Sequence, residues 1–294
     1  MAGELAKRVA VAMVGIPLLL VVIYLGGWFL ASLLAAVAAL GTLEFYRLVR
    51  SSDVQPFDLP GAAGSALLVL TATTGTPVVG GSRMWNTAVL LMIVFLVLAV
   101  WKRAPNRRPL AATATTMAGA LFVGGSLAYA VWLREIPGIT QGPLSPKDFS
   151  TAWRGTALVA FPLVIIWLSD SFAYFTGRAF GRRKLLPRVS PGKTVEGAVA
   201  GLLAGTAVAI LLGRSILGPQ VGVAASPLLW ACGGVTIAAF GQLGDLAESL
   251  LKREAGVKDS GTLLPGHGGV LDRFDALFFA FPVSYWFLRW VGLQ

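Results

Sequence analysis

The chain has 294 residues, of which 56% are hydrophobic and only 13% are charged, and its mean hydropathy is +0.74. Soluble domains carry about 25% charged residues, so this composition excludes an ordinary soluble domain and indicates a polytopic membrane protein. The single cysteine, Cys232, excludes a disulfide within the chain and a CxxC metal site. The net charge of +10 does not indicate nucleic-acid binding, because no basic stretch is interleaved with base-stacking aromatic residues.

Apolar stretches of roughly 17–25 residues, the length that crosses a bilayer as a helix, recur along the whole chain. We therefore predict an all-α integral membrane protein with about nine transmembrane helices. The first stretch follows Lys7 and Arg8, as in a signal peptide, but no clear small-residue cleavage site follows it, so we expect an uncleaved span. The predicted spans are 9–27, 29–46, 60–78, 86–101, 112–133, 156–177, 195–217, 223–244 and 272–291.

We predict two parts: residues 1–155 with the first five spans, and residues 156–294 with the last four and the polar loops between them. Small residues recur at a spacing of four in the seventh span, at Gly197, Gly201 and Gly205. Such a stripe favours close packing between helices in lipid.

The basic residues predict the orientation. With the N-terminus inside, 18 of the 24 Lys and Arg residues fall in inner segments and 6 in outer ones, which is the bias expected of cytoplasmic loops. We therefore expect a cytoplasmic N-terminus. The longest outer loop, residues 134–155, shows no cluster of charge, and we assign it no function.

Acidic residues gather at the inner ends of neighbouring spans. Asp245, Glu248, Ser249 and Lys252 follow the i, i+3, i+4, i+7 spacing of one helix face. A carboxylate at a membrane boundary is costly unless it meets a cation or water. Several carboxylates together would suit Mg²⁺, which takes waters and phosphate oxygens as its other ligands. The alternative is that each acid caps a helix or pairs with a nearby cation. The other acids of this set are Asp170, Asp272 and Asp275.

The inner loop before the seventh span is strongly basic. Ser190 is predicted to be an N-cap, with Pro191 as the first helical residue. The free N–H groups of such a helix start, beside Lys193 and Thr194, suit a phosphate group. A P-loop is excluded, because Pro187 stands where that motif requires its first glycine and no strand precedes it.

The only histidine, His267, lies in a glycine-rich turn that lets the backbone approach a ligand closely. Gly268 and Gly269 follow it. A lone histidine in a loop is often structural, and with no second histidine and no nucleophile–histidine–acid pattern, covalent hydrolase chemistry is not supported.

These motifs resemble the phosphatidate cytidylyltransferase family, also called CDP-diacylglycerol synthases. The most specific motif, about 27 residues long, is similar to the signature of that family, and two upstream motifs are similar to the same family. The signature residues here are Ser249, Lys252, Arg253, Lys258, Asp259, Gly266, His267, Gly268, Gly269, Asp272, Arg273 and Asp275. The upstream residues are Asp170, Ala173, Tyr174, Gly177, Arg178, Phe180 and Gly181, then Ser190, Pro191, Lys193, Thr194 and Glu196. This resemblance covers the C-terminal half, while the first five spans match in hydropathy alone.

The resemblance implies an enzyme, a nucleotidyltransferase that makes CDP-diacylglycerol and pyrophosphate from CTP and phosphatidate in phospholipid biosynthesis. It implies a site on the cytoplasmic face of the plasma membrane and a homodimer, and it leaves open whether a second, monovalent cation accompanies Mg²⁺. The hypothesis for the site is that Asp245 and Asp272 hold the metal, with Asp170 and Glu196 as further ligands or supporting groups. The cations expected to cradle the triphosphate are Lys184, Lys193, Lys252, Arg253 and Arg273, and hydrogen bonds are expected from Ser190, Thr194, Ser249 and His267.

Three alternatives remain. A CTP-dependent polyprenol or dolichol kinase would transfer the γ-phosphate to an alcohol and needs more help with deprotonation than this sequence offers beyond His267. A CDP-alcohol phosphotransferase would require an acidic motif that is absent from the chain. A transporter would place polar residues at mid-membrane, whereas here they cluster at inner helix ends.

Overall fold

The structure, a computed structural model, describes residues 13, 15, 17–75, 81–136, 149–261 and 268–292. It is 84% helical, which confirms the predicted fold class in its coarse form. The described residues fall into two compact units. Unit 1 holds the described residues within Met1–Trp132 and Leu251–Phe274, and unit 2 holds those within Leu133–Gly142, Lys147–Leu250 and Asp275–Gln294. The predicted division into residues 1–155 and 156–294 stays a prediction.

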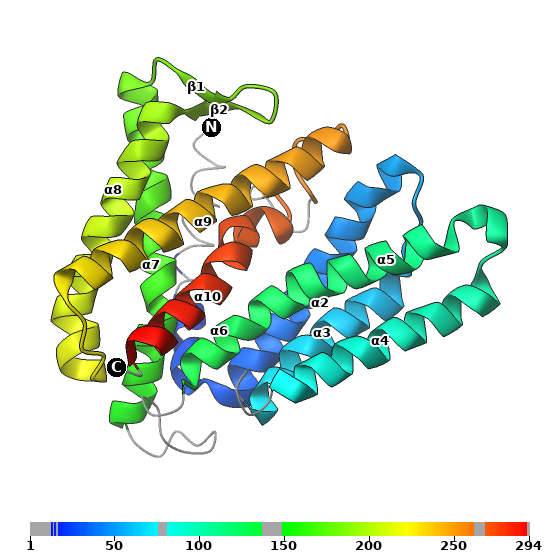
Figure 1. The fold of residues 1–294 in the computed structure, drawn as a ribbon, viewed down its shortest axis with the longest axis horizontal. Helices are drawn as coiled ribbons and strands as arrows, with labels where there is room; N and C mark the ends of the chain where they lie inside the picture. The colour runs from blue at the N-terminus through cyan, green and yellow to red at the C-terminus, as the bar shows by residue number, and fades with distance from the viewer. Residues whose placement is uncertain are drawn as a thin grey trace. The chain divides into compact units, whose positions relative to one another are not determined.

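In unit 1, four helices run side by side: α2 (Gly27–Val49), α3 (Asp58–Thr71), α4 (Gly81–Lys102) and α5 (Pro109–Gly119) (Figure 1). Helix α5 continues through a π-helical segment, Ala120–Gly125, into α6 (Ser126–Arg134). The short 3₁₀ turns are Arg50–Ser52, Ala72–Thr74 and Pro105–Arg107.

Tyr46 fastens α2 to its neighbours in unit 1. Its side chain is fully buried, and its hydroxyl donates a hydrogen bond to the carbonyl of Thr116, 2.6 Å away. Gly61 of α3 and Gly119 of α5 both lie where an added Cβ would collide with the Tyr46 ring. Small residues therefore let three apolar helices approach closely, as is usual for helices that associate in lipid.

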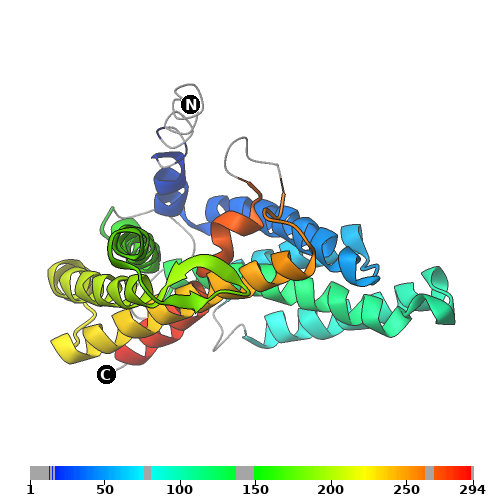
Figure 2. The same ribbon diagram turned by 90° about the horizontal axis from the view of Figure 1, so that it is seen from above.

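Unit 2 contains α7 (Phe149–Phe180), a hairpin of β1 (Lys184–Leu186) and β2 (Ser190–Thr194), α8 (Val195–Leu212), the π-helical segment Gly213–Val221, and most of α9 (Pro227–Glu254) and α10 (Leu271–Gly292). Helix α8 lies along α7, and the hairpin stands at the end where α7 finishes and α8 begins (Figures 1 and 2). The strands pair antiparallel, with Lys184 opposite Thr194 and Leu186 opposite Ser190.

The glycine stripe of α8 packs as predicted. An added Cβ on Gly197 would meet the carbonyl of Ala173 in α7, and one on Gly205 would meet the Ala238 side chain in α9. Gly201 lies against the Gln242 side chain, which donates a hydrogen bond to the carbonyl of Ala198 at 3.0 Å. The stripe thus packs α8 against two neighbours of the same unit.

The predicted helix start at Ser190 is wrong. Residues Ser190–Thr194 form strand β2, and α8 begins only at Val195. The N-cap is Thr194, whose hydroxyl accepts a hydrogen bond from the N–H of Gly197 at 3.1 Å. The pairing of β2 with β1 holds Ser190 in a strand, so that α8 begins after Thr194. The hairpin was not anticipated.

Six helices in the described part of the chain are long and apolar enough to cross a membrane: Gly27–Ser52, Arg83–Lys102, Pro105–Arg134, Thr151–Phe180, Val195–Val221 and Pro227–Glu254. They match six of the nine predicted spans and confirm an integral membrane protein. Helix α3 is shorter, with 14 residues. Helix α10 has 22 residues, but its charged, Trp and Tyr residues reduce its hydropathy. In the first predicted span, 9–27, the described residues up to 25 are helical, Gly26 interrupts the helix and Gly27 begins α2. Residues 9–12, 14 and 16 lie outside the described residues.

Candidate active site

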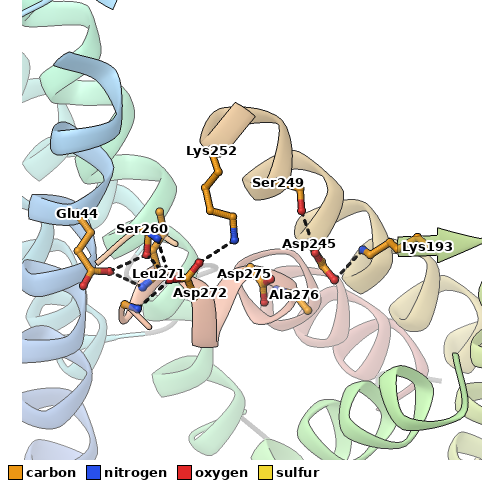
Figure 3. A network of polar contacts seen from close by, with 11 residues as sticks. Glu44, Lys193, Asp245, Ser249, Lys252, Ser260, Leu271, Asp272, Asp275 and Ala276 are labelled. Carbon is orange, nitrogen blue, oxygen red and sulfur yellow. Dashed lines mark hydrogen bonds and ion pairs between the residues drawn. The ribbon is translucent and has the colours of Figure 1, made fainter. Parts of the chain in front are cut away.

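In unit 2, strand β2 and helix α9 bring a lysine to a carboxylate. The ammonium group of Lys193 lies 2.6 Å from Oδ2 of Asp245, and the hydroxyl of Ser249, one helical turn further along α9, lies 3.3 Å from Oδ1 (Figure 3). The side chains of Lys193 and Asp245 are 27% and 33% exposed, so solvent reaches the pair. Asp170, near the end of α7, is exposed and interacts electrostatically with both groups. We call these four residues the Asp245 cluster.

Glu196, expected to be a further metal ligand or a supporting group, binds the backbone between α7 and α8. It lies in the first turn of α8, and its carboxylate accepts hydrogen bonds from the backbone N–H groups of Arg182 and Arg183 at 3.1 and 3.2 Å. Val195 donates its N–H to the carbonyl of Arg183 at 2.9 Å. Glu196 therefore fastens the end of α7 to the start of α8 and supports the strand that carries Lys193.

In unit 1, Asp272 in the first turn of α10 is the centre of a second group. Its Oδ1 lies 2.7 Å from the ammonium group of Lys252 on α9, and the two side chains are only 6% and 14% exposed. Its Oδ2 accepts hydrogen bonds from the backbone N–H groups of Ser260 at 2.9 Å and Gly269 at 2.8 Å, and from the Ser260 hydroxyl at 2.9 Å. Both carboxylate oxygens are thus hydrogen-bonded (Figure 3).

The surroundings keep the Asp272 carboxylate ionised. Burial by itself would raise the pKa of this group, but hydrogen bonds from Lys252, Gly269 and Ser260 outweigh it and hold the pKa at about 2. Asp272 lies in the first turn of α10, before the apolar part of the helix. The Asp272 carboxylate is therefore negatively charged beside Lys252 at neutral pH.

Glu44 is part of this second group and was missed from the sequence. It lies on α2 and is 3% exposed. Its Oε2 accepts hydrogen bonds from the Ser260 hydroxyl at 3.1 Å and from the N–H of Leu271 at 2.8 Å. The signal was present, because an acid inside an apolar span indicates a functional or structural partner. The Asp272 cluster, as we call it, comprises Glu44, Lys252, Ser260, Gly269, Leu271 and Asp272.

The other predicted site residues are placed as follows. Gly268 has a φ of +78°, which favours glycine, and it brings the following N–H to Asp272. Arg253 and Arg273 are exposed, as is Lys184 at the start of β1. Ser190 is half-buried in β2. His267 lies outside the described residues.

The described carboxylates fit Mg²⁺ only as a site of one or two acidic ligands. Among the described residues, no three His, Cys, Asp or Glu side chains gather in a group that could hold a metal ion. Mg²⁺ in phosphate-handling sites is held by only one or two carboxylates, with substrate phosphates and waters as its other ligands. Asp170 and Asp245 supply two hard oxygen groups within one unit and so fit that requirement. Because Asp245 and Asp272 belong to different units, a metal shared between them stays a prediction.

Fold and side chains together define a polytopic helical membrane protein with carboxylate–lysine groups suited to phosphate chemistry. The chain belongs to the cytidylyltransferase family, whose model matches residues 6–291. The match reaches well beyond the C-terminal half in which the motifs lie.

Three curated relatives that match most of the chain are named phosphatidate cytidylyltransferase. The Synechocystis protein is 33% identical over 297 residues, which cover 96% of each chain. The Bacillus subtilis protein is 31% identical over 253 residues, 86% of this chain and 87% of its own. The Haemophilus influenzae protein is 33% identical over 308 residues, 98% of this chain and 99% of its own.

Proposed function

We propose that this protein performs the reaction for which its relatives are named, the transfer of CMP from CTP to phosphatidate, giving CDP-diacylglycerol and pyrophosphate for phospholipid biosynthesis. The observation that carries the proposal is the full-length similarity to phosphatidate cytidylyltransferases. The signature motif from Ser249 to Asp275 supplies a residue of the Asp245 cluster and most of the Asp272 cluster, which connects this similarity to the observed geometry.

The chemistry requires charge neutralisation more than a strong base. An oxygen of the phosphatidate phosphate, ionised near neutral pH, attacks the α-phosphorus of CTP; a new P–O bond forms, the bond between the α-phosphorus and its bridging oxygen breaks, and pyrophosphate leaves with the electron pair. Both reactants are anions. Fixed cations lower this barrier by offsetting the developing charge and by aligning the two phosphates.

Within unit 2, Lys193 is the cation we assign to the triphosphate. It is partly exposed, and its ammonium group is oriented by Asp245. A phosphate oxygen can approach the remaining donors of a lysine that is held in this way. The Ser249 hydroxyl supports the same carboxylate and keeps it directed toward Lys193.

We propose that Asp170 and Asp245 hold Mg²⁺. When bound, the metal would polarise the phosphate oxygens and neutralise part of the triphosphate charge. In unit 1, we propose that Lys252 and the exposed Arg253 and Arg273 also serve phosphate groups, with Asp272 holding Lys252 in position. The sequence leaves open whether a second, monovalent cation also binds.

We further propose a plasma-membrane location with a cytoplasmic N-terminus and a catalytic face on the cytoplasmic side. The basic residues of the β1–β2 hairpin and of the end of α9 support this orientation. Nine spans would add the first predicted span, α3 and α10 to the six candidates, and a homodimer would follow the expectation for the family.

The test is an assay in detergent micelles with labelled CTP and phosphatidate, with and without Mg²⁺. Metal-dependent CDP-diacylglycerol with equimolar pyrophosphate is the expected result. CDP released with a polyprenol, and no product from phosphatidate, would instead identify a lipid kinase.

A further inference from the structure

Glu44 places a carboxylate inside the apolar helix α2, where it accepts two hydrogen bonds from the C-terminal signature segment, residues 249–275. One comes from the hydroxyl of Ser260 and the other from the N–H of Leu271, at 3.1 and 2.8 Å. The residue is 3% exposed. Burying a carboxylate is costly unless it is hydrogen-bonded, so an acid at this position indicates a requirement that a leucine would not meet.

The two partners of Glu44 flank Asp272. Leu271 directly precedes Asp272 in the first turn of α10. Ser260 touches Asp272 through both its N–H and its hydroxyl, each 2.9 Å from Oδ2. The Ser260 hydroxyl therefore lies within hydrogen-bonding distance of two carboxylates (Figure 3). Glu44 is connected to Asp272 in two ways, through Ser260 and through the backbone of Leu271.

The backbone of the signature segment is fitted around Glu44. An added Cβ on Gly261 would collide with Oε1 of Glu44, and one on Gly269 would collide with Oε2 and with the Ser260 hydroxyl. Gly269 also donates its N–H to Asp272 at 2.8 Å. Because Gly261 and Gly269 have no side chain, the backbone at both positions can approach the Glu44 carboxylate closely.

We propose that Glu44 is a positioning residue for the reaction: it fixes Ser260 and the first turn of α10 so that Asp272 holds Lys252 in the catalytic orientation. This inference rests on the proposed function. Glu44 acts through Ser260 and Leu271. Misplacing a catalytic group by about 1 Å can cost about 100-fold in rate, so a small shift of Asp272 is sufficient to lower turnover.

The experiment compares Glu44→Gln and Glu44→Leu with the wild-type protein. The glutamine keeps a carbonyl oxygen that can accept the Leu271 N–H as Oε2 of Glu44 does. The leucine leaves this N–H without that acceptor, and the Ser260 hydroxyl keeps only its contact with Asp272. We expect Glu44→Leu to lower kcat about 100-fold, with KM for CTP changed less than about threefold, and Glu44→Gln to stay within about tenfold of wild type. Hydrogen exchange of the peptide covering residues 268–275 should accelerate in Glu44→Leu and remain slow in Glu44→Gln.

Thr42→Val is the matched control, because Thr42 is fully buried on the same helix and donates its hydroxyl to Ser65 at 2.8 Å, away from the signature segment. It should leave kcat and the exchange of residues 268–275 unchanged. If Thr42→Val lowers kcat as much as Glu44→Leu does, general loss of helix packing explains the effect and the proposal is wrong.

Ser260→Ala keeps the proposal testable if Glu44→Leu does not fold. In the Ser260→Ala background, Glu44→Gln should have a smaller effect on kcat than in wild type, because the shared hydroxyl is already gone. Equal effects in the two backgrounds would overturn the proposal. A wild-type protein without any activity toward phosphatidate would refute the proposed function instead, and the exchange measurement would still report on Glu44.

Discussion

The ammonium group of Lys193 on strand β2 lies 2.6 Å from the carboxylate of Asp245 on helix α9. Both side chains are about one-third exposed or less, at 27% and 33%, and such solvent-accessible pairs contribute only about 0–1 kcal/mol to stability. The pair thus contributes little to the stability of the fold, and a role in the reaction explains its presence better.

Replacing Asp245 should therefore separate activity from stability. We expect Asp245→Asn to lower turnover at least about 100-fold, because the proposed metal ligand and the partner of Lys193 are lost together. The melting temperature in detergent should change by no more than a few degrees. Asp53→Asn is the control, because Asp53 is an exposed acid in the turn after α2. This variant should remain fully active. Near-normal turnover of Asp245→Asn would remove Asp245 from the site.

The Lys252–Asp272 pair should behave in the opposite way, because it is mostly buried. Asp272→Ala removes the buried carboxylate that binds Lys252, Ser260 and Gly269, and we expect a loss of about 3–5 kcal/mol. Lys252→Met should cost less, because Asp272 keeps its hydrogen bonds from Ser260 and Gly269. Thermal unfolding of both variants in one detergent gives the comparison, and the reverse order would contradict this account.

The pH dependence of stability follows from the low pKa of Asp272. Folding lowers this pKa from its ordinary value of 3.8 to about 2. The ionised form therefore stabilises the fold above about pH 4, and this contribution disappears as the pH falls through about 2. The difference in melting temperature between wild type and Asp272→Asn should be constant from pH 5 to 8 and shrink below pH 4. A difference that already shrinks at pH 6 would disprove the assignment.

The cap of α8 predicts a smaller effect. Thr194→Val removes the hydroxyl that accepts the N–H of Gly197 and should destabilise the protein by about 1 kcal/mol. Thr206→Val makes the same substitution within α8, where the hydroxyl bonds only to the carbonyl of Leu202. Equal melting temperatures for the two variants would show that Thr194 is not the effective cap.

The orientation of α8 can be tested by cysteine labelling in a Cys232→Ala background. Arg188 lies in the hairpin before α8 and Arg214 lies in the segment after it, and both are exposed. An impermeant thiol reagent added to intact cells should label Arg214→Cys and spare Arg188→Cys. The reverse labelling pattern would place the hairpin outside.

The sequence by itself determined the apolar helices, because the length and hydropathy of a span are properties of consecutive residues. The predictions for 29–46, 86–101 and 195–217 correspond to α2, α4 and α8. It also determined the family, because the motifs between Asp170 and Asp275 lie at characteristic spacings, and the packing face of α8, because Gly197, Gly201 and Gly205 repeat every four residues.

Only the tertiary structure decided which polar groups meet. Lys193 could have joined any nearby acid, and its place in β2, which depends on pairing with Lys184–Leu186, directs it to Asp245. The same pairing moved the cap of α8 from Ser190 to Thr194. Glu44 finds Ser260 and Leu271 through contacts that span more than two hundred residues. Local periodicity carries no information about such contacts, because they depend on how distant helices pack within the folded unit.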